Sequence, residues 1–232
     1  RRFITGAGNY TADRNLPNQV FAYFIRSDRP HAEIVSIDAG NAKSMPGVKL
    51  ILTGEDMAAA GVKALPVNAI AAKSRDGSEL IKATRPALAT GKVRYVGEPV
   101  VCVIAESAAQ AQDAAEHVAI EYKELPHVTT ALDAMKAGAP QLHAHVPGNR
   151  VLDFGTGSDE AKVEAALKAS KKVVKLTLYN NRVVANPMEP RASIASYDAA
   201  KDHTTFYSVS QGVNGLRTNL CLSLGDRKST RL

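Results

Sequence analysis

The sequence predicts an α+β fold built in two units, and three observations lead to this prediction. Short runs of alternating or continuous apolar residues recur along the chain, and such runs are typical of strands. A capped helical segment lies between two of these runs, "PVVCVIA" and "VAIEYKELP". A stretch rich in Pro, Gly and His at 127–155 follows and predicts a boundary. We therefore expect one unit over 1–146 and a second over 147–225.

The first unit is expected to begin with three strands joined by short connections. The strand patterns cover 19–27, 32–38 and 48–54. A helix-like segment at 39–45 is ended by the turn pair Pro46-Gly47. Residues 58–92 carry Gly, Pro and mixed charge without a strong period, which predicts a long, loop-rich excursion.

Residues 92–126 carry the clearest pattern in the chain. Two strand-like runs at 92–107 are hinged at Gly97, and the second is apolar enough to be buried on both faces. Ser107 is a good N-cap, and Gln110 completes a capping box for the helix that follows. A further strand is predicted at 118–126. The order strand, helix, strand predicts a crossover unit.

The second unit is expected to begin with an amphipathic helix at 158–170, with Ser158 as its N-cap. Three strand patterns follow, at 171–184, 192–198 and 203–210. The stretch "GVNGLRTNLCLSLG" at 212–225 predicts a final helix.

Composition excludes several classes of function. The net charge of +6 is spread along the chain, and aromatic residues make up only 5%, which argues against nucleic-acid binding. No apolar run is long enough for a membrane span, and no apolar region follows the N-terminal arginines as in a signal peptide. Cys102 and Cys221 lie in apolar runs without metal-site spacing, which predicts buried thiols and favours a cytoplasmic location.

The two ends of the sequence carry a separate expectation. The last residues, "DRKSTRL" at 226–232, match the in-frame translation of the start of a common sequencing adapter. We therefore expect the natural sequence to depart from this one after Gly225. The chain also lacks an initiating Met, so its two ends are expected to be those of a gene fragment.

Three motifs invite chemistry that their context does not favour. "GTGSDE" at 155–160 lacks a third glycine and a preceding apolar strand, so it predicts a helix entry rather than a phosphate loop. His143 and His145 lack a nearby third ligand, so exposed loop histidines are favoured over a metal pair. Glu98, inside "VGEPV", is interpreted as a turn residue rather than a catalyst.

Two features remain open to a functional interpretation. Gln211 ends a strand pattern just before a helix, where its amide could recognise an oxo group or a carbonyl, or be a surface residue. "NPMEPRA", Asn186 to Ala192, places Glu189 and Arg191 on either side of a proline. This motif is either a solvated turn or an ion pair that shapes a buried site.

Several stretches in one order resemble the large, molybdopterin-binding subunit of the molybdenum hydroxylases. This is the xanthine dehydrogenase, aldehyde oxidase and aerobic carbon monoxide dehydrogenase family. The first unit contributes "RFITGAGNYTAD", "LPNQVFAYFIRSDRPHAEIVSID", "MPGVKLILTGEDM" and "RPALATGKVRYVGEPVVCVIAESAAQAQDAAEHVAIEYKELP". The second contributes "NPMEPRASIASYD" and "SVSQGVNGLR".

The resemblance implies a fold and a role for the candidate residues. Residues 1–126 would form an α/β hammerhead domain, and the part after about 150 would be the truncated start of the molybdenum-cofactor-binding domain. Gln211 would hydrogen-bond an oxo ligand of molybdenum and so contact the cofactor. Glu189 and Arg191 would be scaffold near the cleft, and none of these residues would ligate the metal.

The resemblance also implies a reaction and partners. The family hydroxylates electron-poor carbon, as in aldehydes and N-heterocycles, or oxidises carbon monoxide, with oxygen taken from water. The cofactor would be molybdopterin as the cytosine dinucleotide. FAD and [2Fe-2S] clusters would lie on a medium and a small partner subunit, in a dimer of heterotrimers.

The family's glycine-rich cofactor segment and catalytic glutamate are expected beyond Gly225, so the 232-residue chain alone is expected to be inactive. A hammerhead-type module that docks subunits without catalysis is the alternative.

Overall fold

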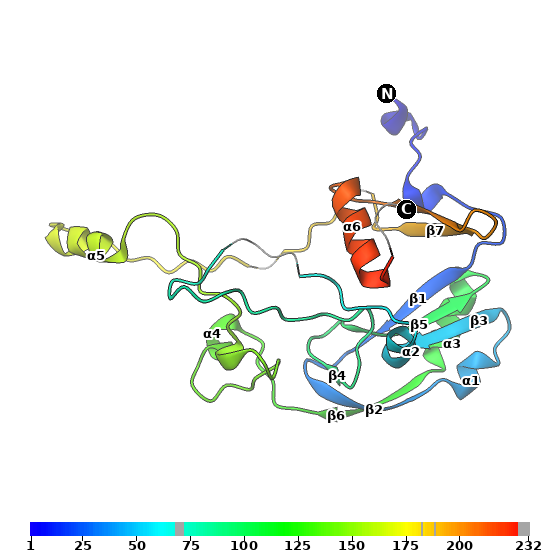
Figure 1. Ribbon diagram of the computed structural model, residues 1–232, viewed down its shortest axis with the longest axis horizontal. Coiled ribbons are helices and arrows are strands. Elements are labelled where there is room, and N and C mark those ends of the chain that lie inside the picture. Colours follow the sequence, from blue (N-terminus) through cyan, green and yellow to red (C-terminus); the bar gives the residue numbers. More distant parts are fainter. Residues whose placement is uncertain (68–71, 182, 188, 227–232) are drawn as a thin grey trace. The chain divides into compact units, whose positions relative to one another are not determined.

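The computed structural model describes residues 1–67, 72–181, 183–187 and 189–226 (Figure 1). All but the first residue of the tail expected from adapter sequence lies outside these described residues. The chain divides into two compact units. The first unit comprises Arg1–Asn68, Ile81–Val151 and Arg191–Leu232, and the second comprises Ala69–Leu80 and Leu152–Pro190. The domain limit expected between 146 and 147 stays a prediction.

The first sheet of the first unit has β5 at its centre. Its members are β1 (Phe21–Arg26), β3 (Val48–Thr53) and β5 (Pro99–Ala105), in the order β1-β5-β3. Both pairings are antiparallel, and Val103 lies opposite Tyr23 on one side and Ile51 on the other. Val100, Val101 and Val103 have no exposed surface. The prediction of a strand buried on both faces is therefore confirmed.

The second sheet of this unit has β2 at its centre and is also antiparallel. Its members are β2 (Ala32–Asp38), β4 (Lys92–Val93) and β6 (Ala119–Glu124), in the order β4-β2-β6. The turn at Gly97, whose φ is +91°, separates β4 in this sheet from β5 in the first. The predicted hinge at Gly97 therefore marks the passage from one sheet to the other.

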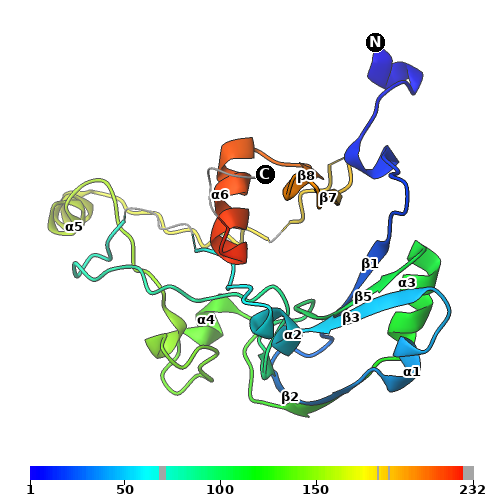
Figure 2. The ribbon, with the colours of Figure 1, turned by 45° about the vertical axis from the view of Figure 1, so that its right-hand side comes forward.

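Helix α3 (Ala108–Glu116) follows β5 and packs against β1, β3 and β5 (Figure 2). Ala111, Ala114 and Ala115 form its buried side. The Ser107 hydroxyl accepts a hydrogen bond from the backbone N–H of Gln110, so the predicted N-cap is confirmed. The Ser107 hydroxyl also donates a hydrogen bond to the side-chain oxygen of Gln110. In a full capping box that oxygen would accept the backbone N–H of Ser107 instead, so the predicted capping box forms only in part.

The predicted crossover unit is wrong. A crossover returns the chain to a parallel strand of the same sheet. Here α3 leads from β5 in the first sheet to β6 in the second, and β6 pairs antiparallel with β2. The predicted order of strand, helix and strand along the chain was correct. Which sheet each strand joined was decided by pairing with strands that are distant in the sequence.

Short helices fill the connections of the first unit. They are α1 (Gly40–Lys43), α2 (Gly54–Ala59), α4 (Ala131–Ala134), and the 3-10 helices η1 (Arg2–Thr5), η2 (Thr11–Asp13) and η3 (Pro147–Asn149). Helix α2 was not predicted from the sequence; its start is fixed by reciprocal hydrogen bonds between Thr53 and Asp56. After α2 the described part of 60–91 makes only isolated bridges, as the loop-rich pattern predicted.

The C-terminal part of the first unit is a hairpin followed by a helix. Strands β7 (Ser193–Asp198) and β8 (His203–Ser208) pair antiparallel, and α6 (Val213–Leu224) follows. The predicted strands at 192–198 and 203–210 and the helix at 212–225 are confirmed. Cys221 on α6 and Cys102 on β5 are free and buried, as expected. Across the described residues, no helix has the length and apolar character needed to cross a membrane.

The second unit contains helix α5 (Glu160–Ala169), which confirms the predicted helix at 158–170. Its N-cap is Asp159, whose carboxylate accepts from the N–H groups of Ala161 and Lys162, and not the predicted Ser158. The predicted strand at 171–184 is wrong for the described residues, which form no strand there. A strand pattern needs a neighbouring strand for its hydrogen bonds, and the described part of the chain supplies none to this segment.

Candidate functional site

Gln211 lies where a strand gives way to a helix, as the sequence predicted. It is exposed, three residues after the end of β8 and two before the start of α6. The N-cap of α6 is Gly212, which has extended backbone and provides no side-chain cap. The first N–H groups of α6 therefore have no side-chain acceptor from their cap residue.

This junction can donate hydrogen bonds to an anionic or oxo group. The Gln211 amide carries two N–H donors and one acceptor. The partial positive charge at the start of a helix favours negative charge nearby. Gly212 adds no side chain at the approach, so a ligand oxygen can come close to the backbone. The geometry thus suits binding of an oxygen-rich group.

The "NPMEPRA" motif leads from the second unit into β7. Glu189 is half-buried, and Arg191 is exposed two residues before β7 begins. Met188 lies outside the described residues. The division between the two compact units falls between Pro190 and Arg191. The ion pair expected between Glu189 and Arg191 therefore stays a prediction.

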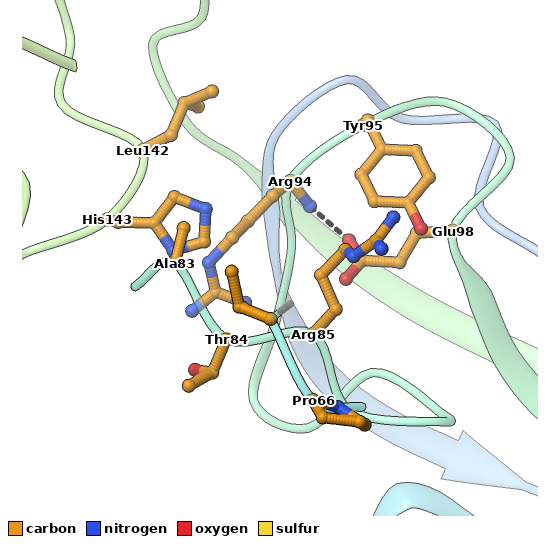
Figure 3. Close-up of a pocket in the computed structure, with 10 residues that line it drawn as sticks. Pro66, Ala83, Thr84, Arg85, Arg94, Tyr95, Glu98, Leu142 and His143 are labelled. Carbon is orange, nitrogen blue, oxygen red and sulfur yellow. Dashed lines mark hydrogen bonds between the residues drawn. The ribbon is translucent and has the colours of Figure 1, made fainter. Parts of the chain in front are cut away.

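A cavity of about 610 Å³ lies within the first unit (Figure 3). Its walls come from three stretches far apart in sequence, namely 66–67 with 83–85, the turn 94–98, and 142–143. Its polar side chains are those of Thr84, Arg85, Arg94, Tyr95, Glu98 and His143. This cavity was not predicted from the sequence, because no local motif links these three stretches.

Glu98 fixes the turn at the edge of this cavity. The residue is buried, with 5% of its surface exposed, and its carboxylate accepts a hydrogen bond from the backbone N–H of Arg94 at 2.5 Å (Figure 3). Its backbone carbonyl accepts the N–H of Ser27 at 2.9 Å, and the N–H of Gly97 donates to Ser27 at 2.7 Å. These bonds tie the turn to the end of β1. The prediction that Glu98 is a turn residue is confirmed.

Burial gives Glu98 an unusual proton affinity. Removal of the carboxyl group from water raises its pKa above the ordinary value, and the N–H and charge of Arg94 oppose this rise. The carboxylate already accepts a backbone hydrogen bond, so it is committed to the turn. Among the described lining residues, the guanidinium groups of Arg85 and Arg94 are the charged donors.

His143 is half-buried in the cavity wall, which differs from the exposed loop residue expected. Burial lowers the pKa of His143, and the positive charge of Arg94 lowers it further. His145 is exposed, and its Nε2 lies 3.0 Å from the carbonyl oxygen of Lys82. The two rings meet edge to face at 5.8 Å. Over the described ranges, no three His, Cys, Asp or Glu side chains are grouped to hold a metal ion.

Two protein-family models match the chain in succession. Residues 5–126 match the a/b hammerhead domain of aldehyde oxidase and xanthine dehydrogenase. Residues 142–230 match the molybdopterin cofactor-binding domain. The first match contains both sheets and the Glu98 turn. The second contains the "NPMEPRA" motif and Gln211.

Curated relatives give the same picture over almost the whole chain. The chain is 36% identical over 228 residues to the nicotine 6-hydroxylase large subunit of Paenarthrobacter nicotinovorans, covering 97% of this chain and 26% of that protein. It is 32% identical over 236 residues to the carbon monoxide dehydrogenase large chain of Hydrogenophaga pseudoflava, covering 97% and 28%. The chain thus spans about a quarter of the length of these relatives.

Solved structures resemble the described fold closely. Quinoline 2-oxidoreductase from Pseudomonas putida 86 superposes with a TM-score of 0.87 at 31% identity, over 99% of this chain and 28% of that one. A Cu,Mo-CO dehydrogenase superposes with a TM-score of 0.84 at 28% identity, over 99% of this chain and 29% of that one. The hammerhead fold followed by the start of a molybdopterin-binding domain is therefore shown.

Proposed function

We propose a catalytic function from the premise that the chain belongs to the aldehyde oxidase and xanthine dehydrogenase family of molybdenum-dependent oxidoreductases. The premise rests on the hammerhead and molybdopterin cofactor-binding domains, which occur in sequence along the chain. We infer that the parent protein is the catalytic large subunit of a molybdenum hydroxylase. It would oxidise an aldehyde, an N-heterocycle or carbon monoxide with oxygen derived from water.

The position of Gln211 is the observation that most supports this proposal. The residue lies in the region matched by the cofactor-binding domain, at an open junction before α6. Its exposed amide and the N–H groups at the start of α6 fit an oxygen-rich cofactor. When bound, the molybdenum cofactor supplies the two-electron redox chemistry. Gln211 would donate a hydrogen bond to an oxygen of the cofactor and so hold it in one orientation.

The remaining partners follow from the family. We propose molybdopterin in its cytosine dinucleotide form, with FAD and [2Fe-2S] clusters on a medium and a small partner subunit. The expected assembly is a dimer of heterotrimers in the cytoplasm. Among the relatives are a nicotine 6-hydroxylase large subunit and a dehydrogenase complex subunit gamma from Paenarthrobacter nicotinovorans, and these names support a multi-subunit enzyme.

The test compares two glutamine variants of the full-length parent protein purified with its partner subunits. Gln211→Ala should lower kcat about 10- to 100-fold, because a group that orients the cofactor is lost. Its molybdenum content and melting temperature should match those of the wild type. Gln112→Ala is the matched control, since Gln112 is exposed on α3 in the hammerhead domain.

Unchanged kinetics in Gln211→Ala would remove this residue from the site. Full-length protein that contains no molybdenum when isolated from molybdate-supplied cells would overturn the proposed function itself.

A further inference from the structure

The cavity beside Glu98 combines apolar walls with positively charged groups (Figure 3). Its volume of about 610 Å³ suits a small organic molecule. All of its lining residues belong to the first compact unit, so the cavity forms within one part of the chain. A ligand with an apolar body can be shielded from water there. The apolar surface comes from aliphatic side chains and one aromatic ring, namely Pro66, Val67, Ala83, Leu142 and Tyr95.

Arg94 presents an unused edge of its guanidinium group to this site. Its Nη1 donates a hydrogen bond to the carbonyl oxygen of Lys92 at 3.3 Å. Its Nε is buried and has no acceptor among the described residues, and its Nη2 has none there either. Nε and Nη2 form one edge of the planar group, and their two N–H donors match the two oxygens of a carboxylate. A buried donor without a partner is costly, so this edge favours an acceptor that enters the cavity.

Arg85 adds a second positive charge to the cavity wall. Its side chain is exposed and forms no hydrogen bond or ion pair with a described residue. In Figure 3 the side chain of Arg85 extends toward Glu98, and that of Arg94 extends toward His143. Neither guanidinium forms an ion pair with Glu98 in the described structure, and burial raises the pKa of this carboxyl group. Positive charge therefore exceeds negative charge in the cavity, which favours an anion.

His143 and Thr84 supply neutral hydrogen-bonding groups at the same cavity. Burial lowers the pKa of His143, and the charge of Arg94 lowers it further, so the ring is uncharged at neutral pH. The ring then offers one N–H donor and one acceptor nitrogen, and the Thr84 hydroxyl can also donate or accept. Among the described lining residues, Glu98 alone carries a carboxyl group, and it already accepts the backbone N–H of Arg94. The site therefore suits an anion better than a cation.

The apolar walls discriminate between classes of anion. Inorganic phosphate is hydrated on all sides, and its sites in proteins are typically built from N–H groups at helix N-termini. None of the described lining residues of this cavity belongs to a helix. An organic carboxylate instead gains by burying its apolar body against Leu142 and Tyr95 while its charged end meets the guanidinium groups.

We propose that the cavity beside Glu98 binds a small organic carboxylate with an apolar, ring-sized body. The carboxylate pairs with the Nε–Nη2 edge of Arg94, and its body lies against Leu142 and Tyr95. Arg85 provides the second positive charge. The inference goes beyond the proposed function, since neither Gln211 nor molybdenum takes part in this site.

Isothermal titration calorimetry of the full-length protein with its partner subunits tests the ligand class. Benzoate is the probe, benzamide is its neutral analogue of the same shape, and inorganic phosphate is an anion without an apolar body. We expect benzoate to bind at least about 10-fold more tightly than either, because only benzoate combines a charge-assisted pair with apolar burial. Benzamide that binds as tightly as benzoate would overturn the role of the charge. Phosphate that binds as tightly would overturn the organic ligand.

Variants that remove one charge assign the binding to this cavity. Arg94→Gln should weaken benzoate binding about 10- to 100-fold, because a hydrogen-bonded charge pair is lost. Arg85→Gln should weaken it about 2- to 5-fold, since this side chain is exposed and its charge is screened. Lys82→Gln is the matched control and should leave binding unchanged, because Lys82 is exposed in the same stretch and does not line the cavity. Equal binding by the wild type, Arg94→Gln and Arg85→Gln would place benzoate elsewhere and overturn the proposal.

Melting temperatures separate loss of the ligand site from loss of the fold. Arg94→Lys keeps the charge but removes the two-donor edge, so it should bind benzoate about 10-fold more weakly at an unchanged melting temperature. If Arg94→Gln fails to fold, Arg94→Lys and Arg85→Gln decide the question by the same comparison. The titrations require no turnover. Benzoate binding with this variant pattern in a protein without molybdenum would uphold the site while the proposed function fails.

Discussion

Val103 offers a direct test of the sheet that supports the hammerhead domain. It has no exposed surface, lies at the middle of β5, and belongs to the main apolar cluster. Val103→Ala removes two methyl groups, which costs about 1.6 kcal/mol at about 0.8 kcal/mol per buried group. A residual cavity of about 40 Å³ adds about 1 kcal/mol. We expect a loss of about 2.5 kcal/mol in the free energy of unfolding.

This loss should lower the melting temperature of the 232-residue chain by about 5–10 °C, since 1 kcal/mol corresponds to about 2–4 °C at this size. Circular dichroism during heating and urea unfolding would measure it. Val35→Ala on β2 is the matched control, because Val35 is 55% exposed. Its effect should stay within about 0.5 kcal/mol. Equal losses in the two variants would refute the central position of β5.

Two further predictions concern charged groups. Burial raises the pKa of Glu98 above 4.5, so its contribution to stability is present below that pH and is lost as the pH rises through the raised pKa. Glutamine does not titrate, so between about pH 4 and pH 7 the wild type should lose stability relative to the Glu98→Gln variant. Urea unfolding at several pH values measures this difference in the free energy of unfolding, and a difference that does not change with pH would contradict the prediction. Glu189 is half-buried and Arg191 exposed in the described structure; if the full-length protein buries them as an ion pair, Arg191→Ala should cost about 3–5 kcal/mol. Unchanged melting of Arg191→Ala would instead assign "NPMEPRA" to a solvated turn.

Local sequence patterns predicted most elements but not how the strands pair. The strands at 32–38 and 99–105 and the capped helix after Ser107 follow from apolar periodicity and capping, which act over a few residues. The assignment of β5 and β6 to different sheets depends on pairing with β1, β2 and β3, which no local pattern contains. For the same reason the crossover expected from strand, helix and strand was wrong.

Local sequence patterns likewise predicted one part of the candidate site and not the other. Gln211 could be placed at a strand-to-helix junction because the apolar alternation ends there and glycines follow. Its role toward molybdenum comes from the family resemblance and stays a proposal. The cavity beside Glu98 could not be predicted, since Arg85, Arg94 and His143 come from three stretches that are far apart in the sequence. A turn residue and a cavity residue look alike in sequence until the fold brings their neighbours together.

The segment 173–179 shows that a wrong prediction can still carry information. Its alternation of apolar and polar residues records an environment in which one face is buried. The described structure gives that face to water and leaves its backbone without a ladder. A strand also needs a neighbour for its backbone hydrogen bonds, and a local pattern does not contain that neighbour. Alternation of apolar and polar residues alone was therefore not sufficient for a strand here, where the described residues leave the backbone unpaired.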